Sequence, residues 1–524
     1  MHQGSHALKA RPGRVRMPRA VVWIAAALVL VVASVIAVSL ATVTPSGRST
    51  VASAAVLPRQ PSAVTSVLAG APAAISADAA RLLLSAVPSA VVANDARPSE
   101  VTAAAAIASR AHAPLLLMSP GSGAAAQLSA LRVAIKDLRP RAVLPVGIAV
   151  AALSRDLPGA KVVTSARALP AARAAAPLRR VAVLVHSGHG AAGSVVAIAA
   201  STTARAAGAQ VIDVSGDNPE TDPAAIRALA AAKPLQVVAI GAAFGPDRQL
   251  AGRVAVAETG VQLPGGGQVL FPMRRIVALY GNPTTPALGA LGQQDLPASI
   301  ARARTVAAQY TALSKVPVIP AFEIIATVAQ ASPGRSGTYS YQSSVASLRP
   351  WVRAATKAGM YVTLDLQPGR ASLLTQAKLY RSLLMLPNVG LALDPEWHLG
   401  PHQLPLRQIG SIDISEVNAV AAWLAQLTAK YRLPQKLLEL HEFRLSMIRG
   451  VQRLDTRHSD LAIVINMDGQ GAPSTKQQTW DAVVANAPQG VFFGWKDFYV
   501  KDTPMIGPRA TIDHKPAPVL ISYQ

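Results

Sequence analysis

The C-terminal half of the chain alternates short apolar runs with longer segments of helical period. The runs are rich in Val, Ile, Leu and aromatic residues, and most precede a segment whose apolar positions recur at helical spacing. The strand candidates are 276–281, 316–325, 360–367, 389–397, 436–443, 461–469, 490–499 and 518–524. Eight strands with intervening helices predict a (β/α)8 barrel of the TIM type over 276–524. The alternative is an open, doubly wound parallel sheet.

Residues 63–275 show the same alternation, with more alanine in the helical segments. The strand candidates are 89–95, 113–119, 141–147, 180–187, 209–215 and 235–241. Such runs, separated by helices, predict a Rossmann-like parallel α/β domain over 63–275. The pattern Gly188-x-Gly190-x-x-Gly193 fits the dinucleotide fingerprint. A tight turn from strand to helix also requires glycine, so no dinucleotide is predicted.

The N-terminal segment predicts a membrane anchor. Residues 20–43 contain no charged residue and are long enough to span a bilayer as a transmembrane helix. Residues 1–19 are basic without an acid, which places this tail in the cytoplasm by the positive-inside rule. We expect 44–62, rich in Ser, Thr, Pro and Ala, to be a linker, and the bulk of this single-pass chain to lie outside the cytoplasm. A cleaved signal peptide is the alternative, although its apolar core is usually shorter.

Composition narrows the choice of partner. The formal net charge is +23, but the basic residues are dispersed and no zinc-finger or RNA-binding signature accompanies them. Nucleic acid is therefore not expected as a partner, whereas anionic wall polymers or a membrane surface suit the charge. The absence of cysteine excludes disulfides and thiolate metal sites.

Residues 91–147 carry a recognisable arrangement. The sequence VVANDARPSEVTAAAAIASRAHAPLLLMSPGSGAAAQLSALRVAIKDLRPRAVLPVG has a strand ending near Asn94-Asp95, an Ala-rich helix, a strand through PLLL and a last run RAVLPVG. It resembles one copy of the cell-wall-binding repeat (type 2) family of actinobacteria and clostridia. With a diverged second copy, the resemblance covers about 89–245. It implies Rossmann-like units that bind wall polymers, although Thr102-Ala103-Ala104 stands where family members carry an Asp-Ala pair.

Acidic residues gather at the C-terminal ends of the predicted barrel strands, where the active sites of such barrels lie. The fourth candidate strand ends in LALDPEWHLG, in which Asp394 and Glu396 are two residues apart and would share a strand face. Two carboxylates of different pKa are what glycoside hydrolysis requires. The catalytic candidates are Glu396 as general acid, Asp394 as a positioning or stabilising group, and Asp365, Glu439 or Asp497 as the partner carboxylate.

Other side chains at these strand ends are candidates for substrate binding. Aromatic rings offer apolar faces to sugar rings. The predicted substrate-binding residues are Trp397, Trp495, Tyr280, Glu323, His441, Asp468 and Lys496. Structural explanations compete with these roles. Asp365, Asp394 and Asp468 would serve as helix N-caps, Lys496 would neutralise the acids, and Glu439 and His441 would form a buried polar pair.

A metal site is not predicted, and neither is a cofactor. His398 and His402 lie near the acids of the fourth strand end, but Gly400 and Pro401 interrupt the helix that would align the two imidazoles.

The Asp-x-Glu at the fourth strand end is similar to the strand-end acids of barrel muramidases and, more distantly, of chitinases. The whole of 276–524 resembles an uncharacterised family of actinobacterial, membrane-anchored (β/α)8 barrels that follow wall-binding modules, which implies an architecture and no activity. The sequence thus predicts a membrane-anchored envelope protein whose carbohydrate-active barrel hydrolyses wall glycans through paired carboxylates. The alternative is a non-catalytic envelope protein that binds wall glycans.

Overall fold

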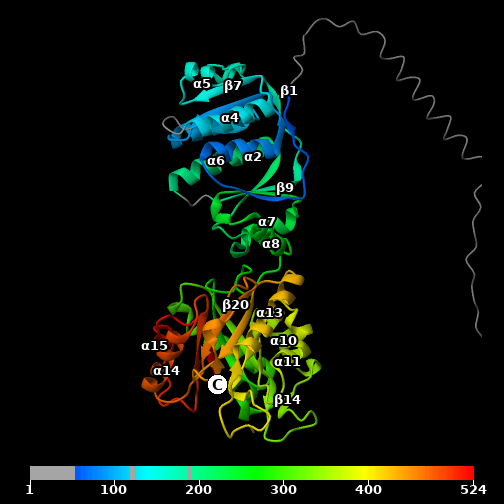
Figure 1. The fold of residues 1–524 in the computed structure, drawn as a ribbon, viewed down its shortest axis with the longest axis vertical. Helices are drawn as coiled ribbons and strands as arrows, with labels where there is room; N and C mark the ends of the chain where they lie inside the picture. The colour runs from blue at the N-terminus through cyan, green and yellow to red at the C-terminus, as the bar shows by residue number, and fades with distance from the viewer. Residues whose placement is uncertain (1–53, 119–123, 187–189) are drawn as a thin grey trace, which may run out of the picture. The chain divides into compact units, whose positions relative to one another are not determined.

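The computed structural model describes residues 54–118, 124–186 and 190–524 (Figure 1). The predicted cytoplasmic tail (1–19), the predicted transmembrane helix (20–43) and most of the predicted linker lie outside these ranges, as does part of the glycine pattern at 188–193. Within the described ranges, no helix is both long and apolar enough to cross a membrane.

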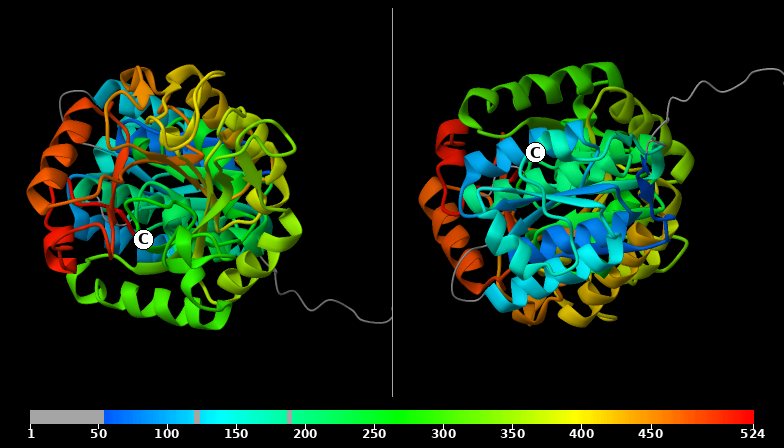
Figure 2. Two further views of the ribbon diagram at one scale, coloured as in Figure 1. Left: turned by 90° about the horizontal axis from the view of Figure 1, so that it is seen from below. Right: turned by 90° about the horizontal axis from the view of Figure 1, so that it is seen from above.

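The C-terminal region forms a closed barrel of eight parallel strands (Figures 1 and 2). They are β12 (Arg275–Gly281), β13 (Val318–Ala329), β15 (Tyr361–Leu366), β16 (Val389–Leu393), β18 (Lys436–His441), β20 (Leu461–Met467), β21 (Phe492–Asp497) and β22 (Leu520–Tyr523). The ring closes because β12 pairs with both β13 and β22. The predicted barrel is confirmed, and the open doubly wound alternative is wrong.

Helices cover the outside of the barrel (Figure 2). They are α9 (Leu296–Ala308), α10 (Val345–Lys357), α11 (Leu373–Leu379), α12 (Arg381–Leu384), α13 (Ile414–Lys430), α14 (Pro473–Asn486) and α15 (Pro508–Ile512). The N-cap residues of α9, α10 and α13 are Asp295, Ser344 and Asp413. Their side chains accept hydrogen bonds from first-turn backbone N–H groups. Outward-facing strand residues such as Leu391 and Leu440 pack with these helices in one apolar core.

The loops at the C-terminal end of the strands depart from simple alternation. The end of β13 pairs antiparallel with β14 (Ser340–Gln342). After β16 the chain forms the 3-10 helix η7 (Pro395–Trp397), where the sequence predicted the end of a strand. Further on, β17 (Ile412–Asp413) pairs with β19 (Ile448–Arg449).

The barrel interior changes from apolar to charged along its axis. At the N-terminal ends of the strands, Ile276, Ile319, Tyr361 and Leu437 pack with Phe271 in an apolar cluster. Because residues two apart share a strand face, the same inward rows continue toward the C-terminal ends. There they carry buried polar groups, namely Tyr280, Glu323, Asp365, Asp394, Glu439, His441, Asn466, Asp468, Lys496 and Ser522. The fold therefore concentrates buried charge at the end where barrel enzymes act.

Two further parallel sheets lie in residues 54–260 (Figure 1). The first has the order β6 (Leu115–Met118), β5 (Ser89–Asn94), β7 (Ala142–Val146). The second has the order β10 (Ala209–Asp213), β9 (Leu178–Val185), β11 (Gln236–Ile240), β3 (Thr65–Leu68). All six candidate strands are present. The sequence missed β3, which pairs with β11.

Helices flank these two sheets. They are α2 (Pro72–Leu83), α3 (Pro98–Arg110), α4 (Ala124–Leu138), α5 (Val150–Asp156), α6 (Gly190–Ala206), α7 (Pro223–Ala232) and α8 (Asp247–Ala257). Two short pairs complete the region, β1 (Ala54–Ala55) with β8 (Ala172–Arg173) and β2 (Leu57–Pro58) with β4 (Leu84–Ala86). Because β1 and β2 fall within 44–62, the end of the predicted linker is part of the folded structure.

Candidate active site at the carboxyl end of the barrel

His441 lies at the centre of a buried cluster contributed by β13, β18 and the end of β20. Its Nδ1 is 2.9 Å from Asp468 Oδ2, and its Nε2 is 3.0 Å from Glu323 Oε1 and 3.6 Å from Glu439 Oε1. Asn466 Nδ2 donates to Glu439 Oε1 at 2.6 Å. All five side chains are buried. The proposed buried pair of Glu439 and His441 is thus present, as part of a larger cluster.

Tyr280 joins a second set of polar groups to this cluster. Its Oη donates to Asp365 Oδ2 at 3.0 Å, and Gln367 Nε2 donates to the same Oη at 3.2 Å. Lys496 Nζ lies 3.3 Å from the centre of the Tyr280 ring, a cation–π contact that strengthens when both groups are desolvated. Strands β12, β15 and β21 therefore contribute to one polar interior.

Asp394 and Glu396 are held by a loop rather than by a strand. Asp394 is the N-cap residue of η7, but its side chain makes no capping hydrogen bond. The backbone N–H of Gly410 donates to the carbonyl oxygen of Glu396 at 2.6 Å. A Cβ at position 410 would also lie only 2.6 Å from that oxygen, so this return of the loop requires glycine. The hydrogen bond from Gly410 thereby holds the backbone of Glu396 in the loop.

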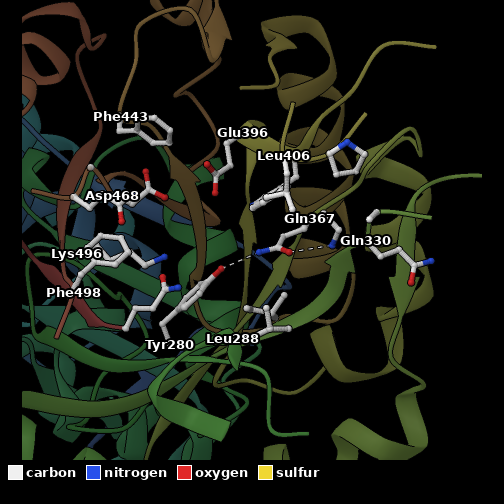
Figure 3. Close-up of a pocket in the computed structure, with 18 residues that line it drawn as sticks. Tyr280, Leu288, Gln330, Gln367, Glu396, Leu406, Phe443, Asp468, Lys496 and Phe498 are labelled. Atoms are coloured by element: carbon white, nitrogen blue, oxygen red, sulfur yellow. Dashed lines mark hydrogen bonds between the residues drawn. The ribbon is translucent and has the colours of Figure 1, made fainter. Parts of the chain in front are cut away.

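A cavity of about 320 Å³ opens at this end of the barrel (Figure 3). Glu396, Asp468, Lys496 and Tyr280 surround one space, and Gln367 lies beside Tyr280 (Figure 3). Apolar side chains complete the lining, among them Trp397, Leu406, Phe443 and Phe498. A pocket with apolar walls and a few convergent polar groups is typical of a small-molecule site.

The two carboxylates of the cavity differ in proton affinity. Burial, together with the negative charge of Asp468, raises the pKa of Glu396 to about 7 against the opposing effect of Lys496. Burial also acts to raise the pKa of Asp468, but the charge and hydrogen bond of His441 outweigh it and lower that pKa below its ordinary value. Near neutral pH, Glu396 is partly protonated while Asp468 is ionised.

The acids behind the cavity retain protons more strongly. Burial raises the pKa of Asp365 to about 6. Burial and repulsion by neighbouring carboxylates raise the pKa values of Asp394 and Glu439 well above the ordinary range. The surrounding acids raise the pKa of Lys496 although burial opposes this, as expected for a neutralising cation. Carboxylates still outnumber cations, so retained protons or a bound cation must balance the charge.

Trp495 and Asp497 lie on the opposite face of β21 from Lys496. Trp495 packs on Trp480 and on His514, with ring centroids 5.7 Å and 4.0 Å apart. Its Nε1 donates to Asp497 Oδ1 at 2.7 Å. The cavity lining contains neither residue. Their predicted site roles stay predictions, and this placement does not favour them.

The capping explanation is wrong for Asp365 and Asp468, whereas Asp394 occupies the N-cap position of η7 without a side-chain capping hydrogen bond. The helix after Asp365 begins at the N-cap Ser372, and the helix after Asp468 begins at the N-cap Ala472. His398, for which the sequence predicts no metal, contacts protein groups through both ring nitrogens. His398 Nδ1 lies 2.9 Å from the carbonyl oxygen of Ser411, and its Nε2 lies 3.5 Å from a carboxylate oxygen of Glu416.

Several residues of the site were not singled out by the sequence. Asn466 donates a hydrogen bond to Glu439 inside the barrel, and Phe443 and Phe498 line the cavity. Asn466 lies on β20 two positions before Asp468, which directly follows the strand, so strand periodicity was the available signal. Phe498 directly follows β21 and Phe443 is the second residue after β18, and neither carried a comparable signal.

Comparison of the chain with protein-family models, with curated proteins and with solved structures gives no match in any of the three.

Proposed function

We propose that the barrel hydrolyses glycosidic bonds of cell-wall glycans, with Glu396 as the general acid and Asp468 as the partner carboxylate. One observation carries the proposal: both side chains line the same cavity, and only Asp468 is bonded to a buried histidine. Glycoside hydrolases pair a proton-donating carboxyl with an ionised one in this way. Asp365, Glu439 and Asp497, which the sequence predicts as partner carboxylates, are buried outside the cavity lining.

The roles follow from this arrangement. Glu396 donates its proton to the leaving-group oxygen as the glycosidic C–O bond breaks. The new oxygen on the anomeric carbon comes from water. Asp468 either accepts the proton of that water or first forms a covalent bond to the sugar, and the anomeric configuration of the first product distinguishes these routes. His441 and Lys496 favour the charged form of Asp468.

The surroundings of the cavity suit a sugar. Gln330, Gln367 and Lys496 offer hydrogen-bond donors to hydroxyl groups, and Trp397 and Phe498 offer ring surfaces. The wall as the location of the substrate rests on the expected transmembrane helix over 20–43 and on the resemblance of about 89–245 to the cell-wall-binding repeat. We accordingly propose a single-pass membrane protein whose barrel acts outside the cytoplasm, on wall glycans or anionic wall polymers.

The test is glycan release by the full-length protein. Purified peptidoglycan and an arabinogalactan-type polysaccharide are incubated with wild type, with Glu396→Gln and with the control Glu416→Gln, whose carboxylate is partly exposed beside His398. We expect soluble reducing sugar from wild type and the control, and none above background from Glu396→Gln. No release by the wild type, with equal retention of all three proteins on the polymer, would overturn hydrolysis in favour of a glycan-binding barrel.

The rate of release should fall as the pH rises above about 7. The pKa of Glu396 is about 7, and the reaction needs its protonated form, so the rate should approach a decrease of about tenfold per pH unit. Asp468 and Asp365 act to raise this pKa, and Lys496 and His441 act to lower it. The measurement is kcat/KM against pH. A basic limb in the ordinary range of a glutamic acid would contradict the assignment of the acid.

A further inference from the structure

The Nε2 atom of His441 faces two carboxylates in a fully buried part of the barrel. Glu323, Glu439 and His441 have no exposed surface. Among the described residues, Glu323 Oε2 and Glu439 Oε2 accept no hydrogen bond. His441 Nε2 contacts only acids, 3.0 Å from Glu323 Oε1 and 3.6 Å from Glu439 Oε1. Unsatisfied atoms of this kind cost free energy in an apolar interior unless a ligand or a proton satisfies them.

The spacing of these atoms fits ligands of one metal ion. The three residues each offer a ligand atom, and these atoms lie within 4.8 Å of one another. Metal–ligand distances of about 2.0–2.2 Å place neighbouring ligand atoms about 2.8–3.6 Å apart in octahedral or tetrahedral geometry. The distances from His441 Nε2 to Glu323 Oε1 and Glu439 Oε1, 3.0 Å and 3.6 Å, fall within that interval.

The surrounding residues resemble the outer shell of a metal site. A metal-bound histidine almost always donates its other ring N–H to a carboxylate or carbonyl, which leaves the free nitrogen to face the metal. Here Nδ1 of His441 lies 2.9 Å from Asp468 Oδ2. Metal-bound carboxylates are hydrogen-bonded in turn, and Asn466 does this for Glu439 at 2.6 Å.

We propose that Glu323, Glu439 and His441 bind a divalent first-row transition metal ion, of which zinc is the best fit. One imidazole and two carboxylates suit zinc or manganese, whereas magnesium and calcium prefer oxygen ligands alone. Two positive charges would also balance the excess of buried acids. The site adjoins the cavity without lining it. Asp468 lines the cavity and its Oδ2 contacts Nδ1 of His441, which is one of the three ligands. The inference does not rest on hydrolysis, since it concerns binding alone.

Metal uptake by the full-length protein tests the site. The chain is purified without a histidine tag, stripped with a chelator, and equilibrated with zinc chloride, manganese chloride or magnesium chloride. Elemental analysis gives the metal per chain, and competition with a chromophoric chelator gives the affinity. We expect about one zinc ion per chain, weaker binding of manganese, no retained magnesium, and a zinc-dependent rise in Tm that the chelator reverses.

Variants locate the ion. Glu323→Gln and His441→Gln should each weaken zinc binding by more than about 100-fold, and Asn466→Ala by about 10–100-fold, the range found for outer-shell residues. Glu442→Gln is the matched control, because Glu442 is buried next to His441 but lies outside the three-residue group, and it should bind zinc as wild type does. Circular dichroism verifies the fold of each variant.

Two results would overturn the metal site. In one, the stripped wild type takes up neither zinc nor manganese and shows no shift in Tm, in which case a proton on Nε2 balances the cluster. In the other, folded Glu323→Gln binds zinc as tightly as wild type does. If the variants fail to fold, the reversible Tm shift of the wild type still decides the question. No glycan is present, so neither result bears on hydrolysis.

Discussion

Replacement of Asp468 by asparagine should lower the rate of glycan release by about 10²–10⁴-fold and leave the protein folded. The amide keeps the shape of the side chain but cannot accept a proton from water or attack the sugar. Because Asp468 also contacts His441, the rate is measured both without and with added zinc. A loss that added zinc reverses would indicate that Asp468 acts only by orienting His441.

A small anion provides a second readout for the same residue. In Asp468→Ala, azide can occupy the space of the missing carboxylate and attack the anomeric carbon, so added azide should restore release and yield a glycosyl azide. Asp481→Asn, an exposed aspartate on α14, is the control and should behave as wild type does. Asp468→Asn with more than about a tenth of the wild-type rate would exclude a direct chemical role, because a partner carboxylate contributes far more than that.

Replacement of Asp502 by alanine should lower the free energy of unfolding by about 3–5 kcal/mol, the cost of leaving a buried charge unpaired. Asp502 forms an ion pair with Lys476, whose side chain is buried under β21 and whose Nζ also donates to the Lys496 carbonyl oxygen at 2.7 Å. Asp502 further accepts hydrogen bonds from the backbone N–H groups of Gly471 and Phe498. In the variant, the nearest remaining acid is Asp497, 4.0 Å from Lys476 Nζ.

Urea unfolding followed by tryptophan fluorescence measures this loss in the barrel, since five of the six tryptophans lie in 276–524. The double variant Lys476→Met, Asp502→Ala removes the unpaired charge and should recover at least about 1 kcal/mol relative to Asp502→Ala. Equal stability of the single and double variants would mean that the ion pair contributes nothing and that only the two backbone hydrogen bonds matter.

The barrel could be predicted from the sequence because each strand is a discrete apolar run and a helical pattern follows most of them. The weak points were elements with little apolar periodicity. The strand β3 is only four residues long and follows a segment rich in Ser and Pro. The 3-10 helix η7 interrupts a run that reads as a continuing strand up to Trp397. In both cases the conformation depends on tertiary contacts, which cannot be predicted from the local sequence.

The site could be predicted only to the level of the strand ends. Buried barrel strands are apolar on both faces, so their sequence does not show which face is inward. The sequence therefore predicts Trp495 and Asp497 together with Lys496, although only Lys496 of β21 lines the cavity. Likewise, Asp468 was expected to bind substrate, and its contact with His441 depends on the pairing of β18 with β20. Such cross-strand neighbours are fixed by register and not by spacing along the chain.

The closure of the barrel has a consequence for how the protein is made. Ile276 of β12 pairs with Leu520 of β22, so the first and last strands of the barrel are neighbours. During synthesis on a ribosome, β12 emerges long before β22, and the edge of β12 that pairs with β22 stays unpaired until then. Contacts between such distant residues form slowly, and exposed strand edges promote aggregation of incomplete chains. We therefore expect nascent barrels of this protein to depend on chaperones until β22 has left the ribosome, and the completed chain to depend on them much less.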